Sequence, residues 1–130
     1  MISIKNLTKI YSGNKKAVDN ISWDIESGEY IAFIGTSGSG KTTALRMINR
    51  MIEATDGQIT MNGKDVRNMN PVELRRSIGY VIQQIGLMPH MTIRENIVLV
   101  PKLLKWSKEN KDSKEKELIK IVELHQENLH

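Results

Sequence analysis

The sequence predicts an α/β fold built around one strand–loop–helix unit. A continuous apolar run at residues 30–34 is typical of a strand buried on both faces. A glycine-rich segment at residues 35–40 follows this run directly. Apolar residues then recur at three- and four-residue spacing up to residue 52, which indicates an amphipathic helix that buries one side.

Two strands are expected before this unit. Residues 2–7 and residues 17–26 alternate apolar and polar side chains with the period of two that half-buried strands show. Ser12, Gly13 and Asn14 lie between them and form a typical turn cluster. The two strands are therefore expected to flank a turn.

Shorter elements are expected after the central helix. Residues 58–61 predict a strand that ends at Asn62-Gly63, a dipeptide favoured in tight turns that need a positive φ. Asn70 has the position of a cap, with Pro71 as the first residue of a short helix that runs to residue 76. The apolar residues 78–82 predict a further strand.

The last part of the chain predicts two helices. Thr92 and Glu95 have the spacing of a capping box, and apolar residues continue the helical pattern to Leu104. Pro101 is expected to kink this helix. A final helix is expected from about Ser113.

Composition excludes several classes of function. The chain has no cysteine, so disulfides, thiolate catalysis and zinc–thiolate sites are excluded. Its longest apolar runs are far shorter than the roughly 20 residues of a membrane-spanning helix, and the N-terminus lacks a secretory signal, so a cytosolic location is expected. The net charge of +4 could suggest a nucleic-acid partner or an anionic membrane surface. Between residues 102 and 120, however, lysines are interleaved with acidic residues, which favours a solvated helix face.

The segment from Gly35 to Thr42 carries the strongest chemical signal. It satisfies the pattern G-x-x-x-x-G-K-[ST], and it lies between a predicted strand and a predicted helix, as a phosphate-binding loop requires. Glycines let backbone N–H groups converge on phosphate oxygens, Lys41 can reach the β- and γ-phosphates, and the Thr42 hydroxyl is a ligand for Mg²⁺. The alternative is a glycine-rich turn with a chance lysine, and it leaves the complete pattern unexplained.

These residues resemble the Walker A segment of ABC-transporter ATP-binding subunits. Residues 78–83 followed by residues 86–97 resemble the Q-loop and the start of the helical subdomain in that family. The resemblance therefore implies a P-loop NTPase core, represented by its N-terminal portion with an antiparallel β subdomain and the start of the helical subdomain. It also divides the chain into residues 1–90 of the core and an incomplete subdomain at residues 91–130.

The resemblance assigns roles to individual residues. Gln83 matches the glutamine that contacts Mg²⁺ and the hydrolytic water, with Gln84 as the alternative. Tyr11 matches the aromatic residue that stacks on adenine. A tyrosine there would otherwise more often fill a surface or a core, so this role rests on the resemblance. Val18 would support its ring. The residues implied to bind ATP are Tyr11, Val18, Gly35, Ser37, Gly38, Ser39, Gly40, Lys41, Thr42 and Thr43. Those implied to bind the metal are Thr42 and Gln83.

Within the family, residues 49–50, 71–76, 83–87 and 100–106 look like those of importers for the osmoprotectants glycine betaine, carnitine or choline. The implied partners are ATP, transmembrane permease subunits and a second ATPase subunit, with no nucleic acid. The implied location is cytoplasmic, on the inner face of the cell membrane. No residue of an ATPase subunit selects the cargo, so this expectation rests on the resemblance alone.

The family pattern also includes a Leu-Ser-Gly-Gly-Gln signature, an acidic strand with an adjacent glutamate, and a switch histidine. None of these occurs in the 130 residues, so the chain is expected to be an N-terminal fragment that does not hydrolyse ATP alone. Two alternatives remain open, a nucleotide-binding module without turnover and a soluble ABC-type ATPase.

Overall fold

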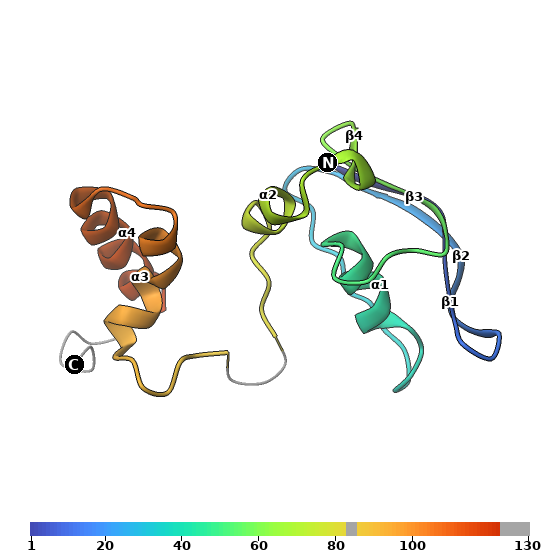
Figure 1. Ribbon diagram of the computed structural model, residues 1–130, viewed down its shortest axis with the longest axis horizontal. Coiled ribbons are helices and arrows are strands. Elements are labelled where there is room, and N and C mark those ends of the chain that lie inside the picture. The colour runs from blue at the N-terminus through green and yellow to red at the C-terminus, as the bar shows by residue number, and fades with distance from the viewer. Residues whose placement is uncertain (83–85, 123–130) are drawn as a thin grey trace. The chain divides into compact units, whose positions relative to one another are not determined.

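The computed structural model describes residues 1–82 and 86–122, and Figure 1 shows how their helices and strands follow one another. The chain divides into two compact units, Met1–Tyr80 and Val81–His130. None of the helices in the described ranges is long and apolar enough to cross a membrane.

The first unit is built on a four-stranded sheet with the order β2-β1-β3-β4, in which each neighbouring pair is antiparallel. Strands β1 and β2 form the hairpin expected around residues 12–14, and Tyr11 pairs with Lys15 across its turn. The hairpin strands are longer than predicted at the turn, because pairing continues to its edge. The strands are β1 (Ile2–Tyr11), β2 (Lys15–Ile25), β3 (Asp56–Met61) and β4 (Lys64–Asp65).

Helix α1 (Lys41–Ile48) lies against one face of this sheet (Figure 1). Its buried side chains include Met47, which is 1% exposed, and they meet the buried Ile4 and Leu7 of β1. Arg50, beyond the helix, has a φ of 53° and lies in the left-handed region. The helix therefore ends before residue 52, to which the apolar pattern extended, and before Asp56-Gly57, which was expected to end it.

Two short helices complete the first unit. The 3₁₀ helix η1 (Val66–Asn68) follows β4, and α2 (Pro71–Arg76) follows η1. Asn70 caps α2 as expected, because its side chain accepts hydrogen bonds from the N–H groups of Val72 and Glu73. The predicted turn at Asn62-Gly63 is also confirmed, with φ values of 50° and 78°.

The expected strands at residues 30–34 and 78–82 are wrong. Neither segment is a strand in the described structure, and Tyr30, Ile34 and Val81 are almost fully exposed. A strand needs a neighbouring backbone to pair with, and in the described sheet neither segment pairs with any of the strands β1 to β4. Apolar patterning predicts burial but supplies no partner.

The second unit contains α3 (Ile93–Leu103) and α4 (Lys108–Ile121), which pack against each other. The capping box at Thr92 and Glu95 is confirmed by bonds in both directions, of 2.8 and 3.2 Å. Helix α4 begins earlier than predicted because the Ser107 hydroxyl accepts a hydrogen bond from the Asn110 N–H and caps the helix there.

Candidate functional site

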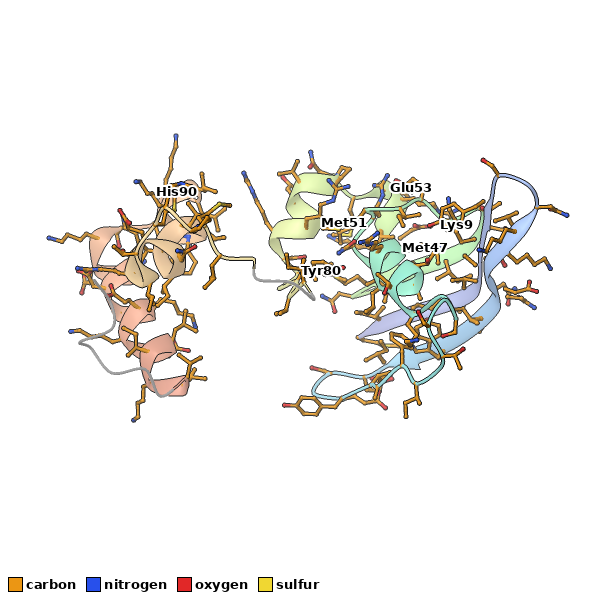
Figure 2. The ribbon with its side chains drawn as sticks, turned by 90° about the horizontal axis from the view of Figure 1, so that it is seen from below. Lys9, Met47, Met51, Glu53, Tyr80 and His90 are labelled. Carbon is orange, nitrogen blue, oxygen red and sulfur yellow. The ribbon has the colours of Figure 1, made fainter. Side chains whose placement is uncertain are left out.

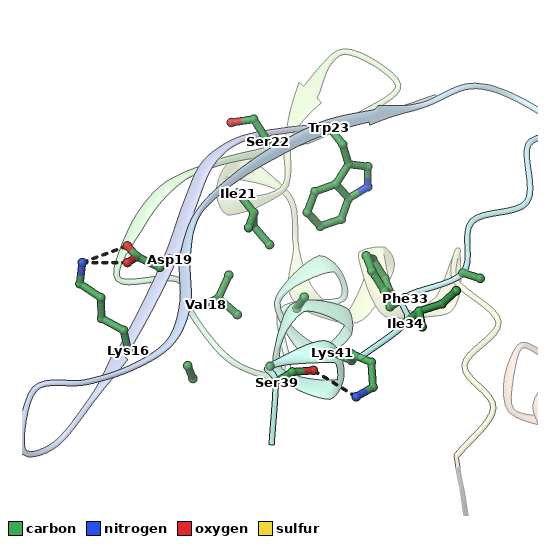
Figure 3. A pocket seen from close by; sticks show the side chains of 14 residues that line it. Lys16, Val18, Asp19, Ile21, Ser22, Trp23, Phe33, Ile34, Ser39 and Lys41 are labelled. Carbon is green, nitrogen blue, oxygen red and sulfur yellow. Dashed lines mark hydrogen bonds and ion pairs between the residues drawn. The ribbon is translucent and has the colours of Figure 1, made fainter. Parts of the chain in front are cut away.

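The glycine-rich segment forms a loop that leads directly into α1. The Lys41 side chain turns back into this loop, where its Nζ donates to the carbonyl oxygens of Gly35 at 2.8 Å and Thr36 at 2.7 Å and to the Ser39 Oγ at 3.1 Å. Figure 3 shows the bond between Lys41 and Ser39. The single cation of the loop therefore lies among its backbone atoms, at the start of a helix.

Gly40 joins this loop to the hairpin of the sheet. Its φ of 91° is left-handed, and it is the N-cap residue of α1 without a side chain to cap it. A Cβ at this position would collide with the carbonyl oxygen of Ala17 in β2. Glycine is therefore required both for the backbone conformation and for the close approach of the loop to the strand.

A cavity of about 410 Å³ lies where the loop and the hairpin meet. One wall is the hairpin on either side of its turn, and the other wall is the loop with the first turn of α1. The residues that line it are Tyr11, Lys15, Lys16, Ala17, Gly38, Ser39, Gly40, Lys41, Thr42 and Thr43. Seven of the ten residues that the sequence predicted to bind ATP are thus brought together.

The remaining predicted residues lie elsewhere. Gly35 contributes a carbonyl group to Lys41, and Ser37 is an exposed residue of the loop. Val18 is 7% exposed and belongs to the hydrophobic core, so its side chain does not face the cavity that contains Tyr11. Gln83, which was predicted to be catalytic and to bind metal, lies outside the described residues.

Lys15, Lys16 and Ala17 were not predicted to belong to the site. The signal was present in the sequence, because a hairpin turn after Tyr11 places the first residues of the next strand beside it. The ammonium of Lys16 is paired at 3.0 Å with the carboxylate of Asp19 (Figure 3).

The cavity is electrostatically suited to an anion. Three of its ten lining residues are lysines and none is acidic. Thr42 and Thr43 add two hydroxyl groups at the N-terminus of α1. The partial positive charge of the helix dipole is located at the same end. Clustered positive charge and unpaired N–H groups favour phosphate over a neutral ligand.

A second, larger cavity of about 700 Å³ lies between β2 and the segment before the loop. Its lining is mainly apolar, and Figure 3 shows Trp23 and Phe33 facing each other in it. Their ring centroids are 5.3 Å apart at an angle of 73°, an edge-to-face contact. Phe33 is thereby half-buried, although neighbouring Ile34 is 94% exposed.

Comparison with known families identifies the class of protein. The family model for ABC transporters matches residues 18–129. The chain therefore belongs to the ABC transporter family, and the fold class predicted from its sequence is confirmed.

Two curated relatives show how similar the chain is to individual members. It is 62% identical over 127 residues to the carnitine transport ATP-binding protein OpuCA of Listeria monocytogenes, covering 98% of this chain and 32% of the relative. It is 54% identical over 129 residues to the glycine betaine/carnitine/choline transport ATP-binding protein OpuCA of Bacillus subtilis, covering 99% of this chain and 34% of the relative. The chain thus spans about a third of the length of these relatives.

Solved structures agree with this assignment. The dimeric structure of MJ0796, a bacterial ABC transporter cassette, matches with a TM-score of 0.83 and 33% identity, over 100% of this chain and 60% of the other. A post-hydrolysis state of the same cassette, bound to ADP and Pi, matches with a TM-score of 0.82 and 31% identity, over 99% and 60%.

Proposed function

We propose that this chain binds ATP together with Mg²⁺ in the cavity between the hairpin and the glycine-rich loop. The observation that carries the proposal is the convergence of Tyr11 with Gly38–Thr43 on one cationic cavity. Phosphates would occupy the loop end, and the base would stack on the Tyr11 ring. The solved cassette bound to ADP and Pi supports this choice of ligand.

The residues at the start of α1 fit a magnesium ion. Mg²⁺ prefers oxygen ligands and retains several waters, so one or two protein oxygens beside the phosphates suffice. The exposed Thr42 lines the cavity one residue after Lys41, and its hydroxyl would hold the ion. When bound, Mg²⁺ neutralises charge on the phosphates. Gln83 is a second proposed ligand and the proposed catalytic residue.

Lys41 has the central binding role in this proposal. All three N–H donors of its ammonium have acceptors within the loop. Phosphate oxygens that enter the loop would compete for these donors, and a charge-assisted bond to phosphate is stronger than a bond to a neutral carbonyl. The same side chain therefore holds the loop together and binds the ligand.

The intact protein would be the ATPase subunit that energises an importer of a small osmoprotectant such as glycine betaine, carnitine or choline. The names of the two curated relatives support this choice. Under this proposal, residues 1–90 belong to the ATP-binding core, and residues 91–130 begin the helical subdomain. The subunit would dimerise and bind transmembrane permease subunits at the cytoplasmic face of the cell membrane.

A nucleotide-binding role without turnover is the second candidate for the chain by itself. The lining of the cavity favours it, because none of its described residues carries a carboxylate that accepts a proton from the attacking water. The chain should then bind ATP and release phosphate no faster than the background.

The test of the proposed function is ATP binding by calorimetry with Mg²⁺ present. Lys41→Ala should weaken binding at least 10-fold, since hydrogen bonds to charged groups contribute about 1.5–3 kcal/mol. Lys64→Ala, a change of an exposed lysine in β4 outside the cavity, is the matched control. Equal affinity of the Lys41→Ala variant and the wild type would contradict the proposal.

A further inference from the structure

The ring of Tyr11 has a cation on one of its sides. The Nζ of Lys9, from the same strand, lies 5.3 Å from the centroid of the Tyr11 ring. A cation within about 6 Å of an aromatic centroid is attracted to the electrons of the ring. The same Nζ donates a hydrogen bond of 2.7 Å to the carbonyl oxygen of Glu53, a residue that follows α1 (Figure 2).

These two contacts restrict a side chain that would otherwise be free to move. Tyr11 is 42% exposed and lies at the edge of the hairpin, next to the turn. The bond to Glu53 fixes the ammonium relative to the segment beyond α1, 44 residues away in the sequence. The fixed ammonium in turn favours one orientation of the ring, which lines the cavity together with the loop.

An ordered ring is important for stacking. A base that stacks on a mobile side chain must also order it, and the entropy lost in this ordering lowers the affinity. The Lys9 ammonium lies near one face of the Tyr11 ring, and the opposite face would be free to stack on the base. A cation that attracts the ring therefore improves base binding without touching the nucleotide.

We propose that Lys9 is a positioning residue for the base of the nucleotide, acting through the ring of Tyr11. This inference rests on the proposed function, because it requires the base to stack on Tyr11. The competing explanation is structural, namely that Lys9 only satisfies the Glu53 carbonyl group and joins β1 to the segment after α1.

The experiment compares ATP with inorganic tripolyphosphate, which has no base, on the full 130-residue chain. Lys9→Met retains the aliphatic stem but loses the cation, and should weaken ATP binding about 2- to 5-fold, the size of an exposed cation–π contact. Binding of tripolyphosphate should not change. Lys9→Arg keeps a cation for the ring and should restore ATP affinity.

Lys5→Met is the matched control, since Lys5 is an exposed lysine of the same strand and does not line the cavity. Its affinity for ATP should equal that of the wild type. Urea unfolding of each variant shows whether the substitution lowers the stability of the fold. If Lys9→Met binds both ligands less tightly and also unfolds at lower urea, the structural explanation is correct and the inference is overturned.

A double-mutant cycle with Tyr11→Ala decides whether Lys9 acts through the ring. The effect of Lys9→Met on ATP binding should disappear once Tyr11 is alanine. The inference is overturned if the effect persists in that background, or if Lys9→Met binds ATP as tightly as the wild type. Failure of the proposed function looks different, because the wild type would then bind no ATP or Lys41→Ala would bind it equally well. Absence of ATP binding by the wild type overturns both.

Discussion

Substitution of Gly40 by alanine should destabilise the first unit and disrupt its nucleotide site together. The left-handed φ of 91° costs an L-residue about 1–2 kcal/mol relative to glycine. The new Cβ would in addition collide with the carbonyl oxygen of Ala17 and lie 3.3 Å from Cγ2 of Val18. Relieving such overpacking moves the backbone and typically costs about 1–3 kcal/mol. The expected loss of folding free energy is therefore about 2–5 kcal/mol.

Two other glycines separate these contributions. Gly38 and Gly63 have φ values of 79° and 78°, and a Cβ on either would have no other atom within 4 Å. Gly38→Ala and Gly63→Ala therefore carry only the backbone cost of about 1–2 kcal/mol. Gly38 lies in the loop and Gly63 in a distant turn, so they also control for position.

Urea unfolding followed by circular dichroism measures the three variants, and ATP titration measures the site. Gly40→Ala should have the lowest midpoint and the weakest binding, because the loop must move away from β2 to accommodate the methyl group. If Gly40→Ala unfolds at the same urea concentration as Gly63→Ala, the close approach of the loop to Ala17 does not exist in solution and the geometry of the cavity is wrong.

Two further predictions concern acid stability and helix capping. The Arg67 guanidinium donates a hydrogen bond to Asp65 and lowers the pKa of that carboxyl to about 2. The folding free energy that this ion pair contributes is therefore present above about pH 4 and is lost as the pH falls toward 2. Asp65→Asn should make the folding free energy depend less on pH over this range. An acid-unfolding curve identical to that of the wild type would contradict the ion pair. Thr92→Ala removes the cap of α3 and should lower the stability of that helix by about 0.5–2 kcal/mol. Hydrogen exchange of the first-turn amides checks this, and unaltered protection would show that the cap contributes nothing.

The starts of α2 and α3 were predicted from the sequence because their signals are local. Asn70 followed by Pro71, and Thr92 followed three residues later by Glu95, each specify a helix start within four residues. The bonds that stabilise these starts form between the same neighbouring residues. No knowledge of the rest of the fold is needed.

The strands were predicted less well because a strand is completed by residues elsewhere in the chain. Ile34 and Val81 belong to equally apolar segments, yet they are 94% and 95% exposed. Ile4, in contrast, is 1% exposed because β1 lies between β2 and β3 and is covered by α1. Ile4 is buried because its strand has neighbouring strands and a covering helix. The apolar pattern of a single segment does not reveal whether such partners exist.

The site combines both situations. Gly38–Thr43 are contiguous, so the sequence motif was enough to predict them. Tyr11 depended on a family resemblance, and Lys15 was missed, although the two pair directly across the hairpin. Only the fold shows that the hairpin faces the loop, since these segments are separated by more than 20 residues of sequence.

The contact between Gly40 and Ala17 explains why the two halves of the cavity depend on each other. The loop supplies the groups for phosphate and the hairpin supplies the ring for a base, and one glycine allows their backbones to approach. A shift of the hairpin relative to the loop changes the distance between Tyr11 and Lys41, and with it the fit to both ends of a nucleotide. Substitutions that loosen the hairpin should therefore weaken ATP binding even where they touch no atom of the ligand. Those that only remove a loop contact should weaken ATP and tripolyphosphate alike.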